Sequence, residues 1–329
     1  MKKMNAVGIA LAATLTVGVS APAFAADFVG TAKKNKIVGT ADADQILGLG
    51  GKDKLWGADG DDRIEGGAGN DRLYGGNGND ELVGGEGKDK VFGEAGGDRI
   101  YTGPGNDKIN TGDGVDYVDA ADGNDKVRAG NGDPAQTDSY RGGYYGADLN
   151  GGAGNDKLTG GTGNDYLFGG DGNDKLKGGL GHDTLYGTTG KDKAKGGDGD
   201  DRFYESNGEG DVLKGGLGND SFGYSGSDGL LKGLLKAIGG AGDDTFYLDR
   251  SELDEKSKIK PGAGNDTVYV KNPVKGTKIV CGSGVDTVYF NIAAKKIKAK
   301  GCENVVYGPD AFHWGPEGSV EVGWRPTAG

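Results

Sequence analysis

Histidine and cysteine, the side chains that zinc prefers, are almost missing from this sequence of 329 residues. The only histidines are His182 and His313, and the only cysteines are Cys281 and Cys302. A zinc centre is therefore not expected. His182 occupies a variable position of the sequence pattern set out below, so we expect its side chain to be exposed.

Long apolar segments are also lacking, apart from an uncharged stretch over residues 6–19. Lys2 and Lys3 precede this stretch, and the small-x-small sequence of residues 23–25 follows it. The arrangement predicts a secretory signal peptide over residues 1–25, because the apolar part is shorter than the roughly 20 residues of a membrane-spanning helix. We expect the remaining chain to be secreted, with no membrane span.

Basic residues are fewer than acidic ones, with 38 Lys and Arg against 50 Asp and Glu and a net charge of −12. This balance disfavours nucleic acid as a partner, since nucleic-acid binding requires clustered Lys and Arg. It disfavours an anionic membrane surface for the same reason. The excess acid requires cations.

Catalytic motifs are missing as well. The sequence contains no H-E-x-x-H, and residues 223–227 fail the G-x-S-x-G pattern at its last position. Neither histidine has a flanking motif for a Ser-His-Asp triad. We therefore expect no enzyme, and the alternative is a secreted enzyme or toxin component whose active part carries no recognisable motif, for which only residues 129–150 and 303–329 leave room.

Glycine, in contrast, is abundant, with 71 residues, and it recurs with a period of nine. Nine consecutive units such as GGAGNDRLY fill residues 48–128, after a degenerate unit that begins at Gly39. A second block fills residues 151–223. Isolated copies begin at Gly239, Pro261 and Cys281.

The positions of each unit have distinct compositions. Position 6 is almost always Asp, position 8 is almost always a large aliphatic residue or Phe, and position 4 is nearly always Gly. Glycine allows positive φ and close backbone contacts, and one apolar side chain per unit fits a short strand with one inward-facing residue. Each unit is therefore predicted to form a six-residue turn followed by a three-residue strand.

These units match the repeat G-G-x-G-x-D-x-U-x, so the chain resembles the RTX (repeats-in-toxin, hemolysin-type) calcium-binding family. Its Cys-Gly turn and Cys-Glu-Asn-Val ending resemble those of secreted actinobacterial RTX-like proteins. The resemblance implies an all-β fold, a parallel β-roll or β-helix solenoid with two units per coil and a C-terminal β-coil cap. Alternate units then stack on opposite sheets, with Leu55, Leu73, Val91, Ile109 and Val127 on one and Ile64, Leu82, Ile100 and Val118 on the other.

Calcium is the cation that this pattern favours, because Ca²⁺ takes six to eight oxygen ligands and the turns offer carboxylates and glycine-rich carbonyls. The resemblance implies that several ions lie between turns two units apart, for example the turns of Asp71 and Asp89. Acids at position 3, such as Asp59, Glu86, Asp113, Asp171 and Asp198, are expected to face solvent instead. The candidate metal ligands are Asp53, Asp62, Asp71, Asp80, Asp89, Asp98, Asp107, Asp116, Asp125, Asp156, Asp165, Asp174, Asp183, Asp192, Asp201, Asp220 and Asp244.

The predicted organisation has six parts. They are a signal peptide (1–25), a first roll block (26–128), an interrupting loop (129–150), a second roll block (151–223), wider coils that form the cap (224–307) and a tail (308–329). Within the cap, Leu230, Leu231, Leu234, Leu235 and Ile238 recur at helical spacing and predict a short helix.

Cys281 and Cys302 stand at matching ends of the last two repeats, and we expect a disulfide there, with two buried free thiols as the alternative. The expected role is a structural, adhesive or interaction function outside the cell. The expected partners are calcium ions and an extracellular polysaccharide or cell surface.

Overall fold

The computed structural model describes residues 26–133, 145–204, 210–223, 236–249, 257–271, 278–291, 298–308, 313–314 and 320–321. These residues form strands and turns. Within them there is no helix with the length and apolar character needed to cross a membrane.

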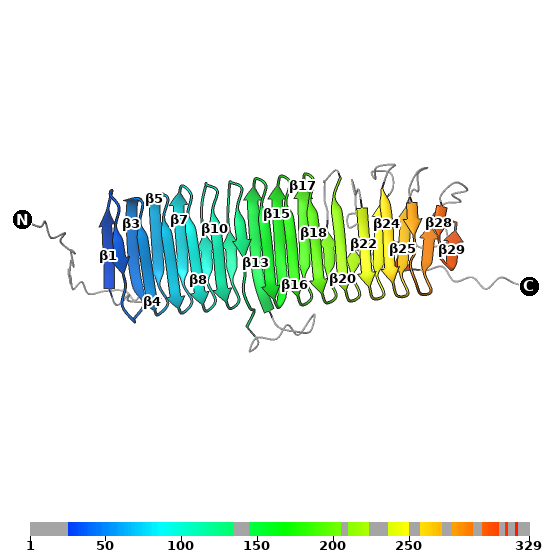
Figure 1. Ribbon diagram of the computed structural model, residues 1–329, viewed down its shortest axis with the longest axis horizontal. Coiled ribbons are helices and arrows are strands. Elements are labelled where there is room, and N and C mark those ends of the chain that lie inside the picture. Colours follow the sequence, from blue (N-terminus) through cyan, green and yellow to red (C-terminus); the bar gives the residue numbers. More distant parts are fainter. Residues whose placement is uncertain are drawn as a thin grey trace, which may run out of the picture.

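The strands alternate between two parallel sheets that run along one elongated solenoid (Figure 1). Each strand pairs with the strand two places further along the chain, so two nonapeptides make one coil and the predicted parallel β-roll is confirmed. The fifteen-stranded sheet, called sheet A here, contains the odd-numbered strands, and the fourteen-stranded sheet B contains the even-numbered ones.

Sheet A consists of β1 (Ala26–Thr31), β3 (Asp44–Gly51), β5 (Arg63–Gly69), β7 (Glu81–Glu86), β9 (Arg99–Tyr101), β11 (Tyr117–Asp119), β13 (Tyr145–Ala153), β15 (Asn164–Asp171), β17 (Thr184–Thr189), β19 (Arg202–Tyr204), β21 (Ser221–Phe222), β23 (Thr245–Asp249), β25 (Thr267–Lys271), β27 (Thr287–Phe290) and β29 (Asn304–Tyr307). Sheet B consists of β2 (Lys36–Val38), β4 (Lys54–Asp59), β6 (Arg72–Asn77), β8 (Lys90–Ala95), β10 (Lys108–Asp113), β12 (Lys126–Arg128), β14 (Lys157–Thr162), β16 (Lys175–Leu180), β18 (Lys193–Asp198), β20 (Val212–Leu217), β22 (Lys236–Ala241), β24 (Lys258–Ala263), β26 (Lys278–Val280) and β28 (Lys298–Lys300). β30 (His313–Trp314) and β31 (Val320–Glu321), within the predicted tail, form a separate antiparallel pair.

The core is a double row of position-8 side chains, as predicted. In sheet B, Leu55 pairs in register with Leu73, and in sheet A, Ile64 pairs with Leu82; all four are fully buried. The remaining members of both predicted rows continue the same register. The core is therefore one layer of side chains from each sheet.

Many strands are longer than the three residues that the sequence predicts. β4 covers six residues, because the pairing continues past position 9 to Ala58 and Asp59, which pair with Gly76 and Asn77 of the next coil. Small residues at positions 1 and 2 allow the coils to approach closely enough for this extended ladder. The turn proper shortens to positions 4 to 6.

The predicted interruption, residues 129–150, is shorter than expected. β13 begins at Tyr145, and its Leu149 pairs with Val118 of the preceding coil of sheet A. On the other side Val127 pairs directly with Leu158, so sheet B continues without a gap. Residues 145–150 therefore belong to the roll.

The predicted helix is wrong where the structure tests it. Residues 236–238 belong to β22, which pairs with β20 and β24, while residues 230–235 lie outside the described part of the chain. Over so few residues, the spacing of apolar side chains does not distinguish a short amphipathic helix from a strand.

The last coils widen as predicted, with Thr245 paired to Thr267 and Thr267 to Thr287 at separations of 22 and 20 residues. They continue both sheets (Figure 1). The predicted disulfide is confirmed, since Cys281 and Cys302 are bonded with a Cα–Cα distance of 5.2 Å. It joins consecutive coils, next to the hydrogen bond from the Cys281 amide to the Lys300 carbonyl.

Candidate calcium sites in the turns

The seventeen aspartates predicted as metal ligands are all buried, each with an exposed fraction of 2% or less. An ionised carboxylate is almost never buried unless it is paired or holds a cation. Sixteen of them directly precede a strand, and the other, Asp165, is the second residue of β15. Burial of so many acidic groups along two edges requires a compensating charge.

These aspartates form two hydrogen-bonded ladders that run along the edges of the roll. In ladder B, which precedes the strands of sheet B, the Asp71 amide donates to Asp89 Oδ1 at 2.7 Å, and the Asp89 amide donates to Asp107 Oδ1 at 2.8 Å. In ladder A, the Asp62 amide donates to Asp80 Oδ1 at 2.8 Å. Hydrogen bonds thus join turns two units apart, which are the turns predicted to share an ion.

The second carboxylate oxygen, Oδ2, of most ladder aspartates is buried and forms no hydrogen bond with the described residues. An unsatisfied buried charge of this kind is expensive, so each Oδ2 is a candidate ligand for a cation. Those with an unsatisfied Oδ2 are Asp53, Asp62, Asp71, Asp80, Asp89, Asp98, Asp107, Asp116, Asp125, Asp156, Asp165, Asp174, Asp192, Asp201, Asp211, Asp220, Asp244, Asp266 and Asp286.

Glycine at position 1 keeps open the space beside this oxygen. A Cβ added to Gly66 would lie 2.8 Å from Asp71 Oδ2 and 2.6 Å from the carbonyl oxygen of Gly84 in the next coil. A carboxylate and a carbonyl oxygen therefore face the same small space. Three or more His, Cys, Asp or Glu side chains do not converge anywhere in the described residues, so backbone carbonyls would supply most ligands of a bound ion. Such an oxygen donor set fits Ca²⁺.

Four acidic residues of the ladders were not among the predicted ligands. Asp211, Asp266 and Asp286 are buried and extend the two rows, and the Asp286 amide donates to Glu303 Oε2 at 2.9 Å. Each aspartate stands at position 6 of a nonapeptide that is stretched or isolated, so the position-6 pattern could have found all three. Ladder A reaches Glu303, whereas Ser257 replaces the aspartate in ladder B.

Position 5, which the sequence suggests is variable, forms a further ladder in the opposite direction. The Lys88 amide donates to Asn70 Oδ1 at 2.7 Å, and the Asn173 amide donates to Asn155 Oδ1 at 2.9 Å. His182 substitutes for Asn here, with its Nδ1 accepting from the Asp200 amide at 2.8 Å. The ring is consequently half-buried and not exposed as predicted. The frequent Asn of the Gly-Asn-Asp triplet was the available signal.

The position-3 acids behave as predicted. All five of them are exposed, because they lie at the strand ends on the outer surface. They are therefore not part of the buried ladders.

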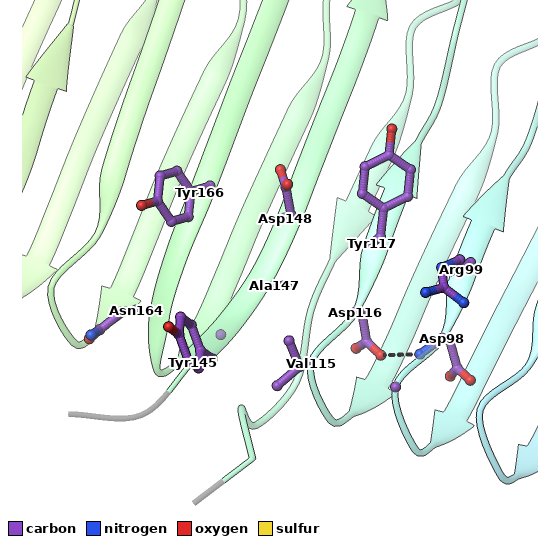
Figure 2. A pocket seen from close by; sticks show the side chains of 12 residues that line it. Asp98, Arg99, Val115, Asp116, Tyr117, Tyr145, Ala147, Asp148, Asn164 and Tyr166 are labelled. Carbon is purple, nitrogen blue, oxygen red and sulfur yellow. Dashed lines mark hydrogen bonds between the residues drawn. The ribbon is translucent and has the colours of Figure 1, made fainter. Parts of the chain in front are cut away.

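Ladder A has one gap, at Ala147, where a hollow of about 310 Å³ opens between the coils of β11 and β13 (Figure 2). Asp98 donates its amide to Asp116 Oδ1 at 3.0 Å, but the next coil presents the methyl group of Ala147. The Ala147 amide resumes the ladder by donating to Asp165 Oδ1 at 2.6 Å. The Ala147 turn therefore contributes no carboxylate to ladder A, between Asp116 and Asp165.

Burial changes the acidity of the ladders. Desolvation raises the pKa of Asp80 to about 7 and that of Asp98 to about 8, against the smaller opposing effect of one amide donor each. Desolvation, followed by the charge of Asp183, raises the pKa of Asp201 to about 9. Without metal, the folded turns therefore hold protons more tightly than unfolded ones.

We expect the calcium-free roll to become less stable as pH rises from about 4 to about 8, since the folded state binds more protons than the unfolded state over this range. Calcium competes with those protons, so saturating calcium should reverse the trend. Circular dichroism at pH 5 to 8, in EDTA and in CaCl₂, measures both. A β signal in EDTA that increases with pH would contradict the burial argument.

Asp80→Ala is expected to remove about one calcium ion and to lower the affinity of neighbouring turns, because its Oδ1 joins two coils and its Oδ2 is unsatisfied. Asp44→Ala should have little effect. Asp44 Oδ2 already accepts hydrogen bonds from the amide and hydroxyl of Thr40, at 2.5 and 3.0 Å. Calcium titration by calorimetry distinguishes the two variants, and equal losses would exclude ions shared between turns.

A parallel solenoid with aspartate ladders along both edges has the features of a calcium-binding β-roll. The RTX calcium-binding nonapeptide repeat matches residues 29–64, 56–91, 92–127, 141–176, 177–204 and 237–250, which is more than half of the chain. The protein belongs to this RTX repeat family. Comparison with curated protein sequences gives no match.

Proposed function

We propose that this protein is a secreted, non-enzymatic β-roll that binds several Ca²⁺ ions in its turns and serves a structural or adhesive role outside the cell. The observation that carries the proposal is the row of buried carboxylate oxygens that have no hydrogen-bond partner among the described residues. Its ligands are the predicted aspartates, together with Asp211, Asp266 and Asp286.

Two further features support the extracellular part of the proposal. Residues 1–25 have the pattern of a secretory signal peptide. The Cys281–Cys302 disulfide suits an oxidising compartment. Calcium at millimolar concentration outside the cell would keep weak sites occupied.

Binding to insoluble cell-wall and extracellular glycans, with calcium or with EDTA, tests the proposed adhesive role. Calcium-dependent retention on one glycan class is the expected result. A variant of ladder A, Asp62→Ala with Asp80→Ala, should lose retention in proportion to its lost calcium. Failure of the wild-type chain to bind any of these glycans while it remains calcium-loaded would reject adhesion but not calcium binding.

A further inference from the structure

The strands of sheet B share a feature that the repeat pattern does not explain. Thirteen of the fourteen begin with Lys or Arg at position 7, and Val212 is the exception. Register pairs these residues directly with one another from coil to coil, for example Lys108 with Lys126 and Lys157 with Lys175. The row is Lys36, Lys54, Arg72, Lys90, Lys108, Lys126, Lys157, Lys175, Lys193, Lys236, Lys258, Lys278 and Lys298.

The same position in sheet A shows that the repeat does not require a cation there. Its strands carry Gln45, Glu81, Asp148 and a run of threonines, with Arg63 among the few basic residues. Both sheets use the same turns and the same core position. The cationic row is therefore a property of one face and not of the fold.

Position 9 adds further positive charge to the outer face of sheet B. Six further cations occupy it in sheet B, and no acidic residue occupies position 7 or 9 of that sheet. The nineteen cations are half of the 38 Lys and Arg residues of the chain. The six are Arg128, Lys177, Lys195, Lys214, Lys260 and Lys300.

The cations of this face whose side chains the structure describes form no ion pair with another described residue. The ion pair found in the described part of the chain joins Arg63 and Glu81, which lie in sheet A. Lys36 lies over the ring of Trp56 at 5.5 Å. In the middle of the row, Lys108 and Lys157 are exposed.

Such a row is unfavourable in isolation. Neighbouring strands are about 4.7–4.9 Å apart, and like charges directly opposite each other on adjacent strands are destabilising. Fourteen strands at this spacing extend the row over about 60 Å. The bases are thus concentrated at positions 7 and 9 of sheet B, whereas acids of that sheet such as Asp59, Asp113 and Asp198 lie at the strand ends, although the whole chain is acidic.

We infer that sheet B binds a linear acidic polysaccharide laid along the solenoid axis. Regularly spaced carboxylate or sulfate groups would neutralise successive lysines, and a flat face suits an extended chain. This inference rests on the proposed extracellular role and names the chemical class of its partner.

Nucleic acid fits this face less well. Single-stranded nucleic acid requires free aromatic faces on which bases stack. The rings on sheet B are already stacked on one another, with Trp56 and Tyr74 at 5.2 Å and Tyr74 and Phe92 at 4.9 Å, nearly parallel.

The test measures binding of the full calcium-loaded protein to chondroitin sulfate, with neutral dextran and single-stranded DNA as comparisons. The variant Lys157→Gln/Lys175→Gln/Lys193→Gln removes three adjacent cations of sheet B. Its matched control, Arg63→Gln/Arg99→Gln/Arg202→Gln, removes three cations from the same repeat position of sheet A.

We expect chondroitin sulfate to bind in a salt-sensitive way, the sheet B variant to bind about tenfold more weakly, and the sheet A variant to bind as the wild type does. Calcium content and circular dichroism of each variant separate this result from loss of the roll. No binding, equal losses in both variants, or tighter binding to DNA than to chondroitin sulfate would each overturn the inference. Unchanged calcium binding in those cases would leave the calcium-binding part of the proposed function intact.

Discussion

Removal of calcium is expected to unfold the roll, so that the far-UV circular dichroism of residues 26–329 changes from β-rich in millimolar CaCl₂ to largely disordered in EDTA. One buried Leu or Ile per nine residues contributes roughly 1.5–3 kcal/mol. Ordering the backbone of those nine residues costs about 1–2 kcal/mol each. Apolar burial alone therefore cannot hold the coils together, and the buried carboxylates oppose folding further.

Magnesium at the same concentration is the control, since Mg²⁺ demands a stricter octahedral site and loses its water reluctantly. We expect it to restore much less β structure than calcium does. A spectrum in EDTA identical to that in calcium would show that the ladders are stable without metal. Such a result would remove the basis of the proposed calcium sites.

Gly87→Ala is expected to destabilise the calcium-loaded protein by roughly 3–5 kcal/mol. Gly87 stands at position 4 with φ of 135°, a conformation that a residue with a Cβ rarely adopts. A Cβ there would also overlap the carbonyl oxygen of Gly69 in the preceding coil. The backbone strain and the steric overlap occur in the same turn, and relieving either one would require the paired strands to move.

Gly50→Ala is the matched control, at position 3 of its unit. Its φ lies outside the left-handed region, and the nearest atom to an added Cβ is the Ala68 carbonyl oxygen at 3.5 Å. We expect a change within about 0.5 kcal/mol. Urea unfolding of both variants in excess calcium measures the difference, and equal stabilities would mean that position 4 is not under steric constraint.

The period of nine was sufficient to predict the fold. Strict Asp at position 6 and an apolar position 8 correctly placed Leu55 beside Leu73 and Ile64 beside Leu82, two units apart. This worked because each repeat contacts only its neighbours, so local spacing determines register.

Other features were not predicted because substitutions at the characteristic positions make a repeat unit unrecognisable in the sequence. Ala147 replaces the aspartate that marks a turn, so the strand that begins at Tyr145 was predicted to be loop. Residues 236–238 have an apolar spacing that a helix would share. The charge of sheet B was missed because consecutive units lie on opposite faces, and only every second unit carries the lysine.

The ladder at the sheet A edge is interrupted at Ala147, whereas the ladder at the sheet B edge is continuous there. Residues 134–144 lie between β12 and β13 in the sequence, yet the Asp125 amide on the other edge still donates to Asp156 Oδ1 of the next coil at 2.7 Å. One edge thus accepts an insertion while the other preserves its continuity. The roll is therefore a scaffold in which a peptide could be inserted at one edge without dividing the solenoid into two.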